Sequence, residues 1–279
     1  MDSVPYLFCD SVVGRFEGFI DLPTSFLPWK VAFDDHLQNI TKLELLIGFE
    51  EGEWSYSFIK RVCSGNVSFT YAELKEEKRK YLQIRYVGFG SKQNHSSSRQ
   101  EIEYIVRFTV PYLNMTSLQL LNNQIEETDY STLLSYFRSV ELPYIYADHY
   151  RTSFDYTFYL QSNWLKSFGI AGSGWPLEIQ QRIEEFMLKP SFVTVNCEGT
   201  NLVFDRAFFE RVFELSASKK TRRLQAVFSI HFEDIRIFNK TLQTASSDDR
   251  IVWRRVDGVK VALQRCYGSW MLTWGDESN

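Results

Sequence analysis

Residues 1–40 carry apolar positions at helical spacing. A first helix is predicted near the N-terminus, where Pro5 suits a first helical turn. Its apolar face comprises Phe8, Cys9, Val12, Val13 and Phe16. A second helix is predicted over residues 28–38, with Trp29 and Phe33 on one stripe. We therefore expect a small helical unit at the start of the chain.

After residue 40 the apolar positions alternate with a period of two, which is typical of half-buried strands. The alternation runs through "KLELLIGF" and "EWSYSFIKR", with a hairpin turn "EEG" between them, and returns in "KYLQIRYVGF" and "EIEYIVRFTV". We expect residues 41–110 to be mainly antiparallel strand with one solvated face. The polar stretch "GSKQNHSSSRQ" is expected to be a mobile loop.

The second half of the chain mixes both periods. "STLLSYFRSV" predicts a short helix, "FDYTFYLQ" a strand, and the glycine-rich "GIAGSGWP" a connector. Pro176 begins a predicted helix whose buried stripe is Ile179, Ile183, Phe186 and Met187. "SFVTVNC" and "RRLQAVFSIHF" predict strands on either side of a helix capped by Asp205. Asp257-Gly258 indicates a hairpin, and "SWMLTW" a last strand paired with it.

These elements predict an α+β fold: a short N-terminal helical unit followed by mainly antiparallel sheets with packed helices. The regions are a helical unit at 1–40, a β-rich α+β region at 41–168, a connector at 169–176 and a C-terminal α+β region at 177–279. With 279 residues, 44% of them hydrophobic, the chain has enough apolar content for one or two globular domains.

The net charge and the cysteine content limit the classes of function that the chain can have. The net charge of −4 predicts no general attraction to phosphate backbones or anionic lipids. The cysteines are Cys9, Cys63, Cys197 and Cys266, which form neither a CxxC pair nor a Cys/His cluster. Reduced thiols in an intracellular protein are therefore expected, without a structural metal.

The N-terminal stretch does not fit a secretion signal. Asp2 precedes its apolar run, Asp10 interrupts the run, and Arg15 arrives only afterwards. No later segment offers about 18 uncharged apolar residues in a row, so no membrane span is predicted. We expect a cytoplasmic or nuclear protein that is not secreted.

Motifs for catalysis are weak. "GIAGSGW" lacks the GxGxxG order and the P-loop lysine, and Ser173 does not lie in a GxSxG turn. Asp148 and His149 are neighbours in sequence, but such neighbours often point apart. The acidic turn at residues 50–53 lacks the spacing of a calcium loop and is expected to solvate a hairpin. We predict no catalytic residues, no metal site and no cofactor.

A family resemblance spans most of the chain and is carried by four segments. "VPYLFCDSVVGRF" followed by "PWKVAFDDH" resembles a divergent F-box, and "LVFDRAFFERVFEL" with "IVWRRVDGVKV" resembles the nematode-expanded F-box and F-box-associated families. The resemblance implies a substrate receptor of a cullin-type ubiquitin ligase. The residues it places against the ligase adaptor, or in helix packing, are Val4, Pro5, Phe8, Val12, Val13 and Trp29.

Three functions remain after this reading. The leading hypothesis is an intracellular protein-interaction module, with an adaptor and an unknown target as partners. An RNA-binding module is the second, although nucleic acid is not an expected partner; it would use sheet aromatics with the basic residues of "KKTRR", "EKRK" and Arg254-Arg255. The third is a small-molecule enzyme whose site is assembled from distant residues.

Overall fold

The computed structural model describes residues 27–63, 65–76, 81–121, 124–215, 222–228, 243–247, 249–254, 259–266 and 269–275. The chain divides into two compact units, Met1–Glu141 and Leu142–Asn279. Each unit combines helices with strands, and this confirms the α+β class. The first helix expected at the N-terminus lies outside the described residues.

The first unit contains a five-stranded path with the order β6-β4-β1-β2-β3, and β5 also pairs with β2. Its elements are α2 (Leu27–Asn39), β1 (Thr41–Glu50), β2 (Glu53–Val62), β3 (Gly65–Phe69), α3 (Tyr71–Glu76), β4 (Leu82–Gly90), β5 (His95–Ser97), α4 (Arg99–Thr109), the 3₁₀ helix η2 (Val110–Tyr112), β6 (Leu113–Leu120) and α5 (Glu127–Ser135). β1 is antiparallel to β2 but parallel to β4, and β4 is parallel to β6. The sheet is therefore mixed, where mainly antiparallel pairing was expected.

The β1–β2 hairpin forms where the sequence placed it. Glu50 pairs with Glu53, and the two residues between them, Glu51 and Gly52, have φ angles of 53° and 84°. Positive φ at both turn positions matches the right-handed twist of the paired strands. The predicted helix over 28–38 is likewise confirmed as α2.

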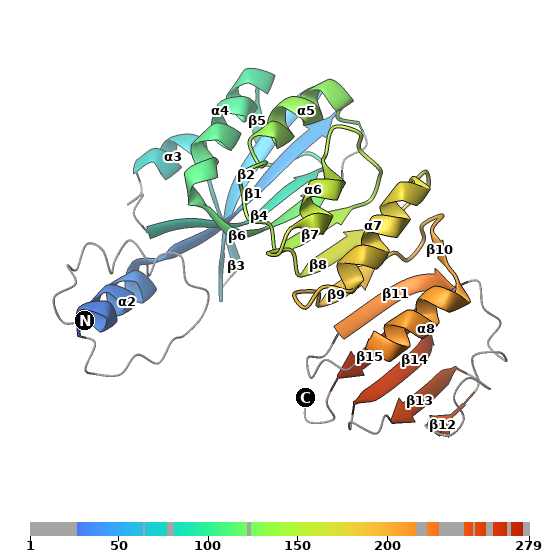
Figure 1. Ribbon diagram of the computed structural model, residues 1–279. Helices are drawn as coiled ribbons and strands as arrows, with labels where there is room; N and C mark the ends of the chain where they lie inside the picture. Colours follow the sequence, from blue (N-terminus) through green and yellow to red (C-terminus); the bar gives the residue numbers. More distant parts are fainter. Residues whose placement is uncertain are drawn as a thin grey trace. The chain divides into compact units, whose positions relative to one another are not determined.

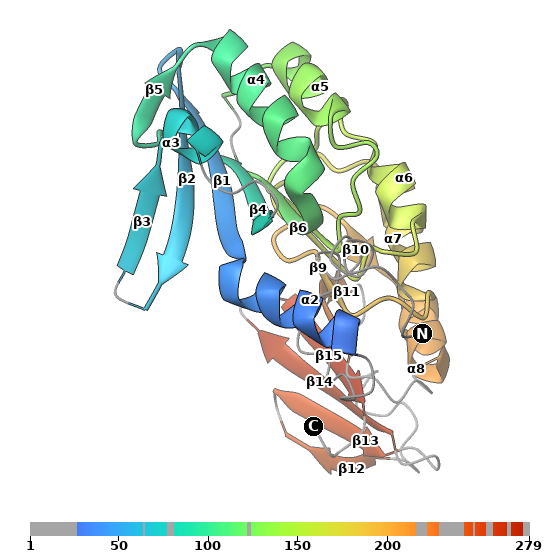
Figure 2. The same ribbon diagram turned by 90° about the vertical axis from the view of Figure 1, so that its left-hand side faces the viewer.

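The segment expected to be a strand at 101–110 is a helix instead. Its buried residues Ile102, Ile105 and Val106 follow a helical spacing, and Tyr104, which alternation placed among the apolar positions, is 52% exposed. The Ser98 side chain accepts a hydrogen bond from the Glu101 N–H at 3.1 Å and caps α4. α4 and α5 cover one face of the first sheet (Figures 1 and 2).

The polar stretch at 90–100, expected to be a mobile loop, is tied to the sheet. The backbone N–H groups of Gln93 and Asn94 donate to the hydroxyls of Ser55 and Ser57, at 2.8 and 3.1 Å. Both serines are completely buried, and β5 then pairs with β2. The hydroxyl of a buried serine on a strand can take the place of a backbone hydrogen-bond partner. The polar composition of residues 90–100 alone therefore did not reveal that this stretch is ordered.

The second unit has the strand order β12-β13-β14-β15-β11-β9-β8-β7. Its elements are β7 (Tyr144–Ala147), α6 (Tyr156–Gln161), β8 (Ser167–Ile170), α7 (Leu177–Met187), β9 (Thr194–Asn196), β10 (Val203–Phe204), α8 (Arg206–Leu215), β11 (Arg222–Phe228), β12 (Gln243–Ser246), β13 (Arg250–Arg254), β14 (Lys260–Cys266) and β15 (Ser269–Gly275). β7, β8, β9 and β11 are parallel, and the later strands are antiparallel. Neighbouring parallel strands are joined through α6, α7 and α8, which lie on one face of this sheet (Figures 1 and 2).

Two expectations for this unit are corrected. "FDYTFYLQ" contains helix α6, not a strand, because Asp155 accepts a hydrogen bond from the Phe158 N–H at 2.9 Å and Tyr156, Tyr159 and Leu160 are buried at helical spacing. The connector placed at 169–176 lies inside the second unit, where it ends β8 and leads into α7. The aromatic residues of "FDYTFYLQ" fit a helical period as well as a strand period. The Asp155 cap is the feature that distinguishes helix α6 from a strand.

Other expectations for the second unit are confirmed. α7 follows Pro176 and buries Ile179, Ile183, Phe186 and Met187. The Asp205 carboxylate accepts a hydrogen bond from the Phe208 N–H at 2.7 Å and caps α8. β13, β14 and β15 form an antiparallel meander. The Asp257-Gly258 turn itself lies outside the described residues.

Candidate partner-binding surface

Of the residues predicted to face an adaptor, the structure describes Trp29. It lies on α2 and is half-buried, while the neighbouring Val31 is 49% exposed and Phe33 is buried. The remaining predicted positions lie outside the described residues: Val4, Pro5, Phe8, Val12 and Val13.

α2 is fixed to the first sheet at its C-terminal end. The Tyr81 hydroxyl, just before β4, donates to the Asp35 carboxylate at 2.6 Å, and the Asn39 amide donates to the same carboxylate at 2.9 Å. Ile40 is the single residue between α2 and β1. The orientation of α2 is thus set by the sheet on which it is mounted.

The parallel strands of the second unit have two very different faces. The face under the helices carries Ile145, Phe168, Val195 and Leu224, all 0% exposed. The opposite face, here called the open face, has no described helix of this unit upon it (Figures 1 and 2). It is formed by the alternate residues Tyr144, Tyr146, Ser167, Gly169, Thr194, Asn196, Arg223 and Gln225.

A tyrosine ring lies across a glycine on the open face. A Cβ atom at Gly169 would lie 2.6 Å from Cδ2 of Tyr146, so only glycine leaves room for the ring. The first unit repeats this arrangement, because a Cβ at Gly88 would lie 2.8 Å from Cε1 of Tyr86. In each case the tyrosine ring packs closely against the backbone of the glycine.

Carboxylates gather where the parallel strands end. Asp148 follows β7 and Glu198 follows β9, each two residues beyond an open-face position. The Gln225 amide donates to the Glu198 carboxylate at 2.5 Å, and the side-chain oxygen Oδ1 of Asn196 accepts from the Glu198 N–H at 2.9 Å. This end of the open face therefore carries negative charge beside an aromatic ring.

Burial shifts two of these groups. It raises the pKa of Asp148, while the nearby His149 and Arg151 act in the opposite direction. Oδ1 of Asp148 is buried and has no hydrogen-bond partner among the described residues. The pKa of Tyr146 is raised by burial and further by the negative charges of Asp148 and Glu198.

Basic side chains occupy the continuation of the open face across the antiparallel strands. The register places Arg250, Arg254 and Lys260 on the same face as Arg223. Arg223, Arg250 and Arg254 are exposed. Arg222, in the same predicted basic stretch, points to the other face and is buried, and residues 77–80 and 219–221 lie outside the described residues.

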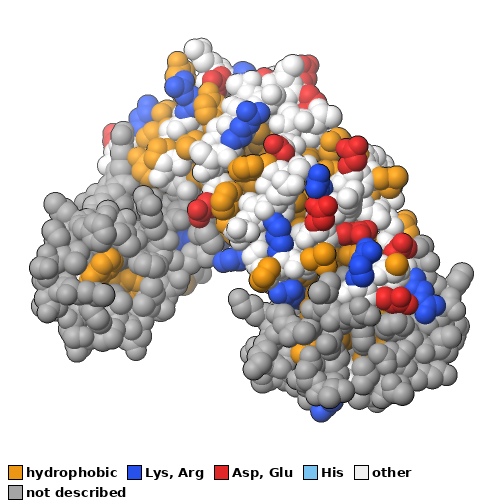
Figure 3. Space-filling view, viewed as in Figure 1, with side chains coloured by type: hydrophobic (Ala, Val, Ile, Leu, Met, Phe, Trp, Pro, Cys, Tyr) orange, Lys and Arg blue, Asp and Glu red, His pale blue; other side chains and the backbone are white. Residues whose placement is uncertain are grey.

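The helix-covered surface of the same unit has a different character. Figure 3 shows Lys and Arg side chains interspersed with Asp and Glu over α7 and α8. Three ion pairs account for this pattern: Arg182–Glu185 at 2.8 Å, Arg206–Glu210 at 2.7 Å and Arg211–Glu184 at 2.8 Å. Because these charges neutralise one another, this surface has little to attract a charged partner.

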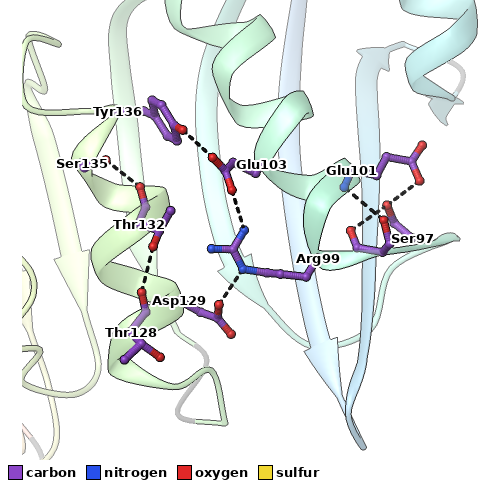
Figure 4. Close-up of polar contacts among 10 residues, drawn as sticks. Ser97, Arg99, Glu101, Glu103, Thr128, Asp129, Thr132, Ser135 and Tyr136 are labelled. Atoms are coloured by element: carbon purple, nitrogen blue, oxygen red, sulfur yellow. Dashed lines mark hydrogen bonds and ion pairs between the residues drawn. The ribbon is translucent and has the colours of Figure 1, made fainter.

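A polar network joins α4 to α5 in the first unit (Figure 4). Nε of Arg99 donates to the Asp129 carboxylate at 2.6 Å, and the Tyr136 hydroxyl donates to the Glu103 carboxylate at 2.6 Å. Arg99 also reaches Glu103 at 3.4 Å. The hydrogen bond to Glu103 raises the pKa of Tyr136. Since each of these charges is paired within the network, we assign it to helix packing.

The other candidates from the sequence acquire structural roles. The loop at 171–175 is held by Asn201, whose amide exchanges two 2.9 Å hydrogen bonds with the Trp175 backbone. In the acidic turn, Glu53 pairs with Lys92 at 2.9 Å. No group of three or more His, Cys, Asp or Glu suited to a metal ion occurs within the described ranges.

No helix in the described part of the chain is long and apolar enough to cross a membrane. No protein-family model, curated protein or solved structure matches the chain.

The open face was missed by the sequence reading. Part of its signal is present, since "YIYA" and "TVN" alternate buried residues with more exposed neighbours, whereas in "SFGI" the last three residues are all buried. These strands are only three or four residues long. Alternation over so short a run carries little weight, and only the parallel pairing brings the runs together.

Proposed function

We propose that the chain is a protein-interaction module that acts as an F-box-like substrate receptor in the cytoplasm or nucleus. Residues 1–40 would bind a cullin-ligase adaptor, and the open face of the second unit would bind the target. The observation that carries the proposal is this face, in which aromatic, amide, hydroxyl and charged side chains are displayed on consecutive parallel strands. Stacked strand–helix units in other proteins use such extended faces for protein recognition.

Placement of α2 is consistent with a docking role for residues 1–40. The C-terminal end of the helix is joined to the sheet through Asp35, Tyr81 and Ile40. Val31 lies on the same helix and is exposed. A partner bound there would be held at a fixed position with respect to the first sheet, as a ligase adaptor requires of a receptor.

Affinity purification with quantitative mass spectrometry tests the two roles separately. Phe8→Glu should lose the adaptor but keep the target, whereas Thr194→Arg should lose the target but keep the adaptor. Leu177→Arg is the matched control, because Leu177 is 75% exposed but lies on α7, on the other side of the sheet from the open face (Figure 1). Thermal melts should first show that all variants fold.

The proposal for residues 1–40 fails if the wild-type chain captures no adaptor or if Phe8→Glu captures it unchanged. The proposal for the open face fails if Thr194→Arg and Leu177→Arg lose the same proteins to the same extent.

One observation favours RNA as the second candidate partner. Arg223, Arg250, Arg254 and Lys260 share a sheet face that also bears Tyr144 and Tyr146, and stacking of bases on such rings has a known strength of about 1–3 kcal/mol per base. Fluorescence titration with single-stranded RNA decides the matter. If the chain binds RNA through this face, its affinity for the RNA should fall steeply as the salt concentration rises. Arg223→Gln should also weaken the binding.

A further inference from the structure

A buried guanidinium lies at the start of β11. Arg222 is 7% exposed, and its Nη2 donates to the Pro190 carbonyl oxygen at 3.3 Å. The guanidinium lies over the Phe192 ring, 5.6 Å from the ring centroid. Its Nε is buried without a hydrogen-bond partner, and no described carboxylate forms an ion pair with Arg222. A buried charge in this position is costly unless an opposite charge accompanies it.

Trp274 adds a second buried donor to the same position. It is directly opposite Arg222 in the β11–β15 pairing, is 3% exposed, and its Nε1 is also buried without a partner in the described part of the chain. Its ring centroid lies 5.8 Å from that of Phe192, so both side chains contact one phenyl ring. Opposite residues of antiparallel strands have Cβ atoms about 4.5–5.5 Å apart. Two buried donors without a described acceptor, Nε of Arg222 and Nε1 of Trp274, thus belong to side chains that lie opposite each other and contact the same ring.

The surroundings of this donor pair are positive. Lys189 precedes Pro190, and its ammonium group donates to the Ser162 carbonyl oxygen at 3.0 Å. Burial lowers the pKa of Lys189, against the opposing effect of the negative charge of Glu185, and burial also lowers the pKa of Arg222. Lys166, exposed just before β8, adds another cation at the N-terminal end of the parallel strands.

We propose that Arg222 and Trp274 form an oxyanion site, occupied by a free phosphate ion or by a phosphate or carboxylate group of a bound polypeptide. A guanidinium and an indole N–H are both donors only, so the occupant must supply acceptor oxygens. Charge-assisted hydrogen bonds to an anion are the strongest available to such a pair. The proposal is independent of the open face, because Arg222 and Trp274 lie on the opposite side of the sheet.

The test follows the indole N–H signals of the full chain by NMR while phosphate replaces chloride at constant ionic strength. The Trp274 signal is identified as the one lost in Trp274→Phe, which keeps an aromatic ring. We expect this signal to shift and saturate in the wild type. Arg222→Gln should abolish phosphate binding, and Trp274→Phe should weaken it about tenfold in calorimetry, the effect of one lost hydrogen bond to a charged group. Arg223→Gln, next in sequence but on the open face, should bind phosphate as the wild type does.

The proposal is overturned if the Trp274 signal does not respond, or if Arg222→Gln and Arg223→Gln weaken binding equally. Should Arg222→Gln fail to fold, Trp274→Phe carries the test alone, and unchanged affinity in that variant also overturns the site. Parallel titrations with acetate, a glutamate-rich peptide and a phosphoserine peptide identify the source of the oxyanion. Tighter binding of a peptide than of phosphate indicates a polypeptide occupant, and a response to phosphate alone indicates the free ion.

Discussion

Asp148 is a carboxyl group in surroundings that disfavour its charge. Because burial raises its pKa in the folded chain, folding is opposed by ionisation and the folded state gains stability as the pH falls through that raised pKa. Asp148→Asn should therefore raise the midpoint of thermal unfolding at pH 7. The gain should shrink as the pH is lowered through the raised pKa of Asp148, because the wild-type carboxyl then becomes neutral as well.

Asp155→Asn serves as the comparison, because the Asp155 carboxylate is exposed and caps α6. A stabilisation by Asp148→Asn that is independent of pH would contradict the assignment to a desolvated carboxyl group.

Cys63 and Cys197 should differ sharply in reactivity. Cys63 is exposed in the β2–β3 turn, whereas Cys197 is completely buried after β9 and burial raises its pKa. Since the thiolate is the reactive form, we expect iodoacetamide to label Cys63 and spare Cys197 in the native chain. Peptide mass spectrometry measures both positions. Labelling of Cys197 before the chain unfolds would be inconsistent with its burial.

At the scale of single elements, α4 depends on its cap. Ser98→Ala removes the hydroxyl that accepts from the Glu101 N–H and should lower the free energy of unfolding by about 1 kcal/mol. Ser96→Ala, two residues earlier and exposed, should change it by less than about 0.5 kcal/mol. Urea denaturation compares the two variants, and equal effects would show that the cap contributes nothing specific.

Elements were recovered from the sequence where a long pattern and a boundary signal agreed. α7 combines Pro176 with a complete apolar stripe, and α8 combines Asp205 with an amphipathic run. The two helices mistaken for strands, α4 and α6, carry apolar residues that fit either period when read alone. Their caps, Ser98 and Asp155, were the unused signals.

Local sequence patterns did not predict the directions of the strands or the residues that form the candidate site. Whether β1 lies parallel to β4 depends on where the intervening chain crosses the sheet, which no single segment encodes. Tyr146, Asn196 and Gln225 are separated by tens of residues and meet only through parallel pairing. The buried state of Arg222 depends equally on Phe192 and Trp274, which the sequence does not mark as its neighbours.

At the scale of the whole molecule, the division after Glu141 predicts which part of the chain loses stability when a core residue is mutated. Ile183 is completely buried on α7, so Ile183→Ala should cost about 2–5 kcal/mol of stability in the second unit. Hydrogen exchange should accelerate mainly at described residues after 141. Equal acceleration on both sides of that position would show instead that the two units unfold as one.

The parallel strands of the second unit have an electrical polarity along their length. Lys166, Lys189 and Arg222 lie near their starts, whereas Asp148 and Glu198 follow their ends. A partner that carries separated acidic and basic groups is therefore rotated as well as attracted by this field. Its acidic end turns toward the starts of the strands before contact. At physiological salt this field extends only about 8 Å, so the turning acts in the final approach. The arrangement bears on the rate and direction of encounter more than on the strength of the final contact.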